Sequence, residues 1–311
     1  MRLTFFMMGA TLFAVVAAAA DPALLRLVPS EPLMVAGLDV DRARLSPFGQ
    51  KILAEMKDED EKFRKLVDST GFDPRRDLLE IVIASAAGAG APQSLVLVRG
   101  AFDPARIGRF LEAEGGSRQV YKGLDVWSGK RGEGGAVFAF VDSTLAVFGD
   151  AAQVRGAIDR QQAGGVAITG PLGARVQDWS GRSDAWFVSG VPLSDMGRGP
   201  GGLVPGGLNV DSIREAAVGV RFGSVIELSG ELTMRSAQDA AALADVVRFV
   251  VSMLRSNPAQ PGTDDLAPIL DTLQLATAGE LMKFSLSVSE TQLEKLLEGP
   301  NYKARRAVAR R

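Results

Sequence analysis

Short apolar runs alternate with capped helices and tight turns along the whole chain, and this order constrains the fold more than any other feature. Residues 33–40 read as a strand, and Ser46 then places a cap residue before the first-turn proline Pro47. Residues 136–141 and 144–148 are separated by two residues, a spacing typical of a β-hairpin. Hairpins pair antiparallel, so the pattern favours an α+β fold, with a parallel βαβ sheet as the alternative.

The two halves of the chain contain the same elements in the same order, which predicts an internal repeat. Residues 33–38 match 185–190, and residues 94–100 match 224–230. We therefore expect a first α+β repeat at 21–163 and a second at 164–299, with a basic tail at 300–311. Each repeat is expected to form an antiparallel or mixed sheet with helices on one face.

Several local patterns give sharper expectations. Residues 120–128 read as one strand, and residues 161–170 as a turn-rich linker. Asp150 and Ser289 each open a capping box, a polar cap followed three residues later by Gln. One long helix is predicted to bury a face of six apolar residues at helical spacing: Leu243, Val246, Val247, Val250, Val251 and Leu254. Trp127 and Trp186 are expected in the core.

The first twenty residues have the pattern of a secretory signal peptide. Arg2 is followed by eighteen uncharged residues, and Ala18 and Ala20 stand at the small-residue positions before Asp21. This predicts cleavage after Ala20 and export through the inner membrane to the periplasm or the outside. An uncleaved anchor is the alternative, because a run of this length can nearly span a bilayer.

The chain has no cysteine and no histidine. This excludes disulfides, thiolate nucleophiles, imidazole general bases and Cys/His zinc sites. The formal charge is −2, but the tail from Lys303 to Arg311 holds five basic residues. Without the tail and Arg2, 29 basic residues stand against 37 acidic ones, a net charge of −8. An acidic body of this kind argues against nucleic-acid binding, whereas the tail could make a weak contact with an anionic surface.

Few motifs suggest catalysis or a cofactor. Gly197 to Gly202 matches a dinucleotide-loop pattern, but Pro200 interrupts it and no helix pattern follows. Three carboxylate pairs could support a hydrolase: Asp39/Asp41, Asp73/Asp77 and Asp264/Asp265. They stand at strand ends and turns, where Asp commonly caps a helix. We therefore assign no catalytic, cofactor-binding or metal-binding residue.

The chain resembles a group of uncharacterised bacterial secreted proteins that carry a domain of unknown function and are loosely labelled periplasmic adhesins. The resemblance rests on the export signal, the Leu25 to Pro29 stretch, the Gly71-Phe-Asp-Pro74 turn and the repeated strand–helix units. It implies a role in the cell envelope and transfers no catalytic residue.

The sequence thus favours an exported, non-catalytic envelope protein that acts by binding a protein, a polymer or an apolar ligand. The alternatives are an anchored envelope protein, a carboxylate hydrolase that needs neither His nor Cys, and a carrier of apolar ligands in a crevice between sheet and helices.

Overall fold

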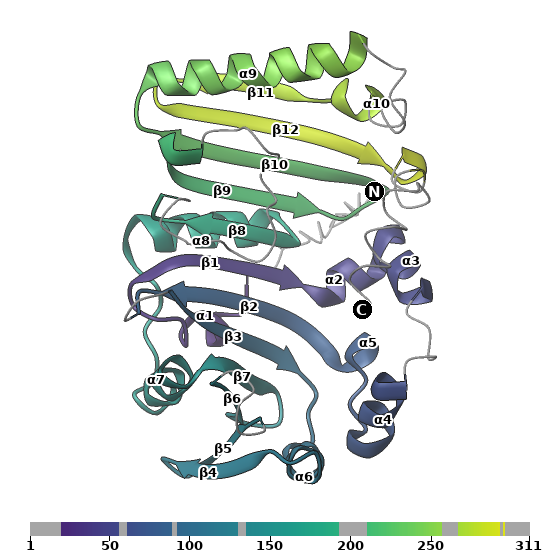
Figure 1. The fold of residues 1–311 in the computed structure, drawn as a ribbon, viewed down its shortest axis with the longest axis vertical. Coiled ribbons are helices and arrows are strands. Elements are labelled where there is room, and N and C mark those ends of the chain that lie inside the picture. The colour runs from purple at the N-terminus through teal and green to yellow at the C-terminus, as the bar shows by residue number, and fades with distance from the viewer. Residues whose placement is uncertain are drawn as a thin grey trace, which may run out of the picture.

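A computed structural model gives the fold and describes residues 20–55, 61–88, 92–129, 135–192, 210–256, 267–292 and 295. Within these ranges, twelve strands form one continuous sheet in the order β11-β12-β10-β9-β8-β1-β2-β3-β7-β6-β5-β4 (Figure 1). Neighbouring strands along it pair antiparallel, as β1 does with both β2 and β8. The predicted α+β class is confirmed, and the parallel alternative is wrong.

The strands are β1 (Pro32–Asp39), β2 (Leu78–Ala86), β3 (Gln93–Gly100), β4 (Ser117–Tyr121), β5 (Leu124–Ser128), β6 (Ala136–Phe140), β7 (Leu145–Asp150), β8 (Ala185–Ser189), β9 (Ile213–Arg221), β10 (Val225–Met234), β11 (Gln274–Ala278) and β12 (Leu281–Ser289). The helices are α1 (Pro22–Leu25), α2 (Val40–Leu45), α3 (Pro47–Glu55), α4 (Glu61–Thr70), α5 (Pro74–Asp77), α6 (Pro104–Ala113), α7 (Ala151–Gln162), α8 (Gly170–Arg182), α9 (Ala237–Ser256) and α10 (Ala267–Leu270).

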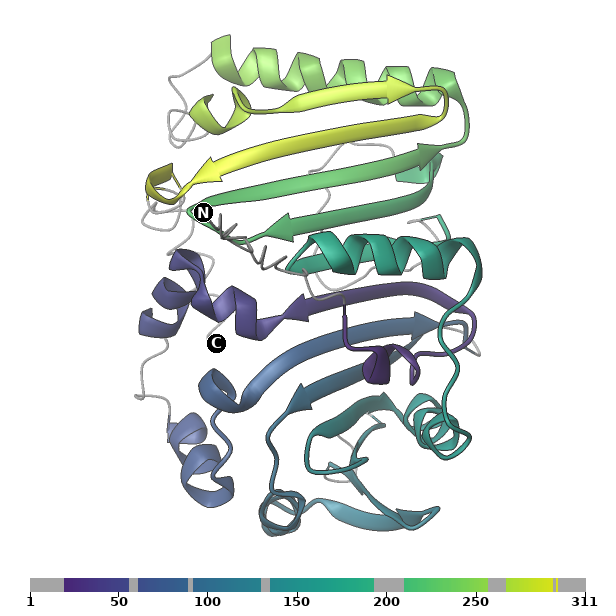
Figure 2. The ribbon, with the colours of Figure 1, turned by 180° about the vertical axis from the view of Figure 1, so that it is seen from behind.

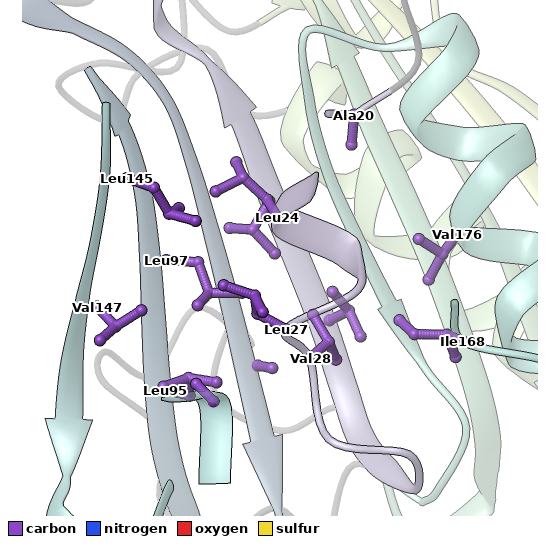
Figure 3. Packing of buried hydrophobic residues seen from close by; sticks show 14 of the residues in the cluster. Ala20, Leu24, Leu27, Val28, Leu95, Leu97, Leu145, Val147, Ile168 and Val176 are labelled. Carbon is purple, nitrogen blue, oxygen red and sulfur yellow. The ribbon is translucent and has the colours of Figure 1, made fainter. Parts of the chain in front are cut away.

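The main core lies where α1, α7 and α8 cover one face of the sheet (Figure 2). Leu24 and Leu27 are fully buried and pack with Leu95 and Leu97 of β3 (Figure 3). Each side chain of this size contributes about 1.5–3 kcal/mol when it is fully buried. The first described turn of the chain is therefore part of the core.

A smaller cluster forms around α6 and the β5–β6–β7 hairpins. Trp127 and Phe140 are both almost completely buried there, and Phe138 meets Phe140 edge to face with ring centroids 4.6 Å apart. Trp186 is buried in the main core. The prediction that Trp127 and Trp186 are core residues is confirmed.

The centre of the sheet is the pairing of β1 with β8. Trp186 of β8 stands opposite Gly37 of β1 and Gly219 of β9. A Cβ atom at position 37 would lie 2.5 Å from the indole ring, so only glycine leaves room for it. Gly37 thus leaves room for the Trp186 ring at the joint between the two halves, whereas a Cβ atom at Gly219 would collide with Ser183 and Trp179.

Elements follow the same order on the two sides of this joint. β1-β2-β3 leads into α6, and β7 of a later hairpin returns to pair with β3. β8-β9-β10 leads into α9, and β12 of a later hairpin returns to pair with β10. The first half has the additional β4–β5 hairpin. The halves thus share one sheet, and their duplication stays a prediction.

Several local predictions were wrong. Residues 120–128 do not form one strand, because Lys122 (φ 49°) and Gly123 (φ 83°) make a tight turn between β4 and β5. Asp150 makes no side-chain cap to α7; its carboxylate accepts a hydrogen bond from the Ser94 N–H at 2.6 Å. By contrast, Ser289 and Gln292 form the predicted capping box. Helix α8 was missed, because three glycines dilute its apolar face.

The long helix α9 is also only partly as predicted. It begins after Ser236, whose hydroxyl accepts from the Asp239 N–H. Ala240 and Ala244 form its buried face, whereas Val246 and Val250 of the predicted face are 45% and 39% exposed. No helix within the described ranges is long and apolar enough to cross a membrane. The leader up to residue 19, the Gly197–Gly202 motif, the Asp264/Asp265 pair and the basic tail lie outside the described residues.

Candidate apolar binding pocket

A pocket of about 280 Å³ lies at the ends of the central strands β1 and β2, where β1 runs into α2 and α5 runs into β2. Figure 1 shows how these elements meet. Its lining is almost entirely carbon. Leu38 and Ile81 stand side by side on β1 and β2 and contribute to it together with Val40, Ala43, Arg44, Phe48, Gly49, Ile52, Leu53, Pro74, Arg75 and Leu78. The volume falls just below the roughly 300–1,000 Å³ of typical small-molecule sites.

Asp39 fixes helix α2 as it leaves the sheet. The Asp39 carboxylate accepts from the Arg42 N–H at 2.8 Å and forms an ion pair with the Arg42 guanidinium at 2.7 Å. Arg42 also pairs at 3.0 Å with Asp184, which is 4% exposed. The N-terminal end of α2 is therefore anchored both to β1 and to the start of β8.

A sharp corner between α2 and α3 closes one side of the pocket. The Ser46 hydroxyl donates to the Ala43 carbonyl at 2.6 Å and accepts from the Gly49 N–H at 3.0 Å, so Ser46 caps α3 as predicted. A Cβ atom at Gly49 would lie 1.9 Å from the Ala43 carbonyl oxygen. Glycine at this position allows the two helices to approach closely enough to form the wall.

Arg44 connects this wall to α5 on the other side. Its guanidinium donates to the carbonyls of Arg75 (2.7 Å) and Arg76 (2.8 Å) and pairs with Asp41 at 2.5 Å. Arg75 in turn pairs with Asp73 at 2.8 Å. Both lining arginines thus have charged or polar partners, and the parts that face the pocket are mainly their hydrocarbon stems.

Phe48 supplies an aromatic side to the pocket. Its ring stacks on Phe222, which follows β9, with centroids 5.5 Å apart and an angle of 18° between the planes. This contact ties α3 to a strand from the second half of the chain. Residues from both halves therefore hold the pocket open.

Two of the predicted carboxylate pairs lie around this pocket as structural groups. Asp73 caps α5 by accepting from the Arg75 N–H, and hydrogen bonding to Arg75 lowers the pKa of its carboxyl group. Hydrogen bonding to Arg76 likewise lowers the pKa of Asp77. Asp39 and Asp41 pair with Arg42 and Arg44. Each of these four carboxylates thus contacts an arginine of its own segment, which is a structural role.

Other parts of the described surface are weaker candidates for a binding site. α9 exposes four apolar side chains at helical spacing, those of Val246, Phe249, Val250 and Met253. The neighbouring hollow between α9 and β11 has a largely polar lining that includes Arg248 and Arg255. Within the described ranges, no group of three or more acidic side chains is placed to hold a metal ion.

Sequence reasoning found the caps around the pocket but missed the pocket. Ser46, Pro47 and the Asp residues were recognised as helix starts. The pocket forms because Leu38 lies beside Ile81 and because α3 stands away from the sheet. Both features depend on strand pairing, which no local pattern reveals. The glycine at position 49, three residues after a cap, was a usable but weak signal of a tight helix corner.

The fold and this pocket define an α+β protein with one long antiparallel sheet and an apolar site at the end of β1 and β2. The chain is similar to TP0453, whose crystal form III superposes with a TM-score of 0.54 at 10% identity, over 90% of this chain and 98% of that chain. Crystal forms I and IV of TP0453 give TM-scores of 0.50 at 11% and 10% identity, covering 90% and 91% of this chain and 97% and 98% of theirs. This likeness concerns the fold alone. No family model and no curated protein matches the sequence.

Proposed function

We propose that the protein is exported to the bacterial cell envelope and there binds, without catalysing a reaction, a ligand that inserts one hydrocarbon chain into the apolar pocket. The observation that carries this proposal is the pocket between α2, α3, α5 and the sheet, with its nearly complete lack of polar lining. The secretory pattern of the leader supports export.

The shape and chemistry of the pocket select the ligand class. Its volume of about 280 Å³ suits one chain and is too small for the two chains of a phospholipid. Each methylene moved from water into the pocket contributes about 0.8 kcal/mol. Because Arg44 and Arg75 already have partners, the head group of the ligand stays in solvent and adds little to binding.

Lipid co-purification tests the proposal. The full chain is expressed with its leader, the exported protein is purified without detergent, and organic extracts are analysed by mass spectrometry. We expect single-chain amphiphiles at up to one per protein. The variant Ile81→Trp fills the pocket from the sheet side and should lose them.

The matched control is Ile83→Trp, on the same strand and the same face but outside the pocket lining and already 38% exposed. It should retain the ligand. Equal loss or equal retention in the two variants, with both folded by circular dichroism, would contradict binding in this pocket. Failure of the chain to leave the cytoplasm would contradict the export part alone.

A further inference from the structure

The backbone nitrogen of Asp21 lies against a partly buried carboxylate. The Asp21 N–H donates to both oxygens of Glu80, each at 3.1 Å. Among the described residues, this single N–H is the donor that reaches the Glu80 carboxylate. Asp21 is also the residue at which the leader is predicted to be cleaved.

Several charged groups surround Glu80. It stands on β2 between Asp39 of β1 and Arg99 of β3. Arg99 pairs with the Asp21 side chain at 2.6 Å rather than with Glu80. The acidic side chains of Asp21 and Asp39 and the guanidinium of Arg99 are thus the charges facing it. Burial raises the pKa of the Glu80 carboxyl to about 7, so this carboxylate lacks sufficient stabilisation when Asp21 carries an amide.

We infer that leader removal converts this hydrogen bond into a partly buried ion pair between the new α-ammonium of Asp21 and Glu80, which locks the mature amino terminus onto the sheet. The inference rests on the exported, leader-cleaved form in the proposed function. A leader peptidase hydrolyses the Ala20–Asp21 bond with one water. The carboxylate stays on Ala20, and the amino group on Asp21 takes up a proton.

The surrounding structure is already built to hold the new terminus. The Asp21 carboxylate caps α1 by accepting from the Ala23 N–H at 2.7 Å, and Arg99 Nε and Nη2 both reach its other oxygen. Leu24 and Leu27, just downstream, are buried in the main core. Asp21 is therefore held from both sides, so its nitrogen can change from amide to ammonium without leaving Glu80. An ammonium offers three donors and a full charge in place of one neutral N–H.

The first test establishes the natural terminus. The exported protein, expressed from the full chain, is sequenced from its amino terminus. A start at Asp21 supports the inference, and any other start overturns it, whatever the result of the ligand experiment.

The second test measures the ion pair. Two chains are compared, a mature chain beginning at Asp21 and an extended chain that keeps the four alanines at 17–20, each with and without Glu80→Gln. Relative to its effect on the extended chain, Glu80→Gln should shift the folding equilibrium of the mature chain about tenfold further toward the unfolded state at pH 7. Glu227→Gln, at an exposed ion pair on β10, is the control and should act equally on both chains.

A spectroscopic measurement separates the ion pair from a general structural role. In carbon-detected titrations, the Glu80 carboxyl should titrate at least one pH unit lower in the mature chain than in the extended chain. The α-amino group of Asp21 should titrate above the ordinary range of about 7.7–8.0. Identical Glu80 titration in the two chains, or an ordinary α-amino titration, would overturn the inference.

Discussion

Glu80 should make the stability of the extended chain depend on pH in an unusual direction. Its folded-state pKa of about 7 lies above the ordinary value of 4.5, because burial disfavours the charged form. The folded chain therefore holds the proton more tightly than the unfolded chain. The contribution of the Glu80 carboxyl to the stability of the folded chain is therefore complete below about pH 4.5 and is lost as the pH rises through 7.

The magnitude follows from the two pKa values. Each pKa unit corresponds to about 1.36 kcal/mol, so the full difference between 4.5 and about 7 corresponds to a loss of about 3 kcal/mol of unfolding free energy at high pH. The Glu80 side chain is only partly buried, so screening by water reduces the expected loss to about 1–2 kcal/mol. Glu80→Gln keeps an oxygen that accepts from Asp21 and removes the charge. It should therefore stabilise the extended chain by about that amount at pH 8 and change it little at pH 4.5.

Urea unfolding of the extended chain at a series of pH values, followed by tryptophan fluorescence, measures this effect. The expected result is that the difference between the parent and Glu80→Gln grows from pH 4.5 to pH 8. A variant that is destabilised at pH 8, or a difference that does not change with pH, would refute the account of Glu80. In the mature chain the sign should reverse, because the α-ammonium then stabilises the carboxylate.

Two further substitutions test the fold around the pocket. Gly37→Ala places a methyl group 2.5 Å from the Trp186 ring and should cost about 1–3 kcal/mol of unfolding free energy, measured by urea titration. The control Gly123→Ala has open space at its Cβ and should show only the strain of its positive φ. An unchanged urea midpoint for Gly37→Ala would contradict the packing at the β1–β8 joint. Asp39→Ala removes the α2 cap and the ion pair with Arg42, and should cost about 1–2 kcal/mol of unfolding free energy, measured by thermal unfolding. Asp41→Ala, at a more exposed ion pair, should cost less than about 0.5 kcal/mol. Equal losses in the two variants would contradict the capping role of Asp39.

Local sequence patterns predicted much of the fold because they depend on local physics. The apolar run in residues 33–40 and the short turn around Asp142 and Ser143 indicate a strand and a hairpin without help from distant residues. Ser46 was recognised as a cap from the proline that follows it, and Ser289 from Gln292 three residues later. The same logic failed at Asp150, where a distant N–H, that of Ser94, competes for the carboxylate.

The remaining features depend on contacts between distant residues. Helix α8 is defined by the burial of Val176 and Trp179 against the sheet rather than by helix propensity, since Gly170, Gly173 and Gly181 all lie within it. Val246 and Val250 on α9 looked like core positions, but the buried face of that helix is centred on Ala240 and Ala244, with Leu243 packed beside them. The pocket and the Asp21–Glu80 contact need the sheet to be assembled before either becomes visible.

The most direct test of the proposed function is the dependence of affinity on the length of the ligand. Isothermal titration of the purified, delipidated protein with saturated fatty acids of increasing length measures it. Each added methylene should tighten binding about fourfold, as expected for about 0.8 kcal/mol, until the pocket is full. Ile81→Trp should bring that limit to shorter chains, whereas Ile83→Trp should leave it in place. An affinity that does not depend on chain length, or a limit that Ile81→Trp does not move, would contradict hydrocarbon binding in this pocket.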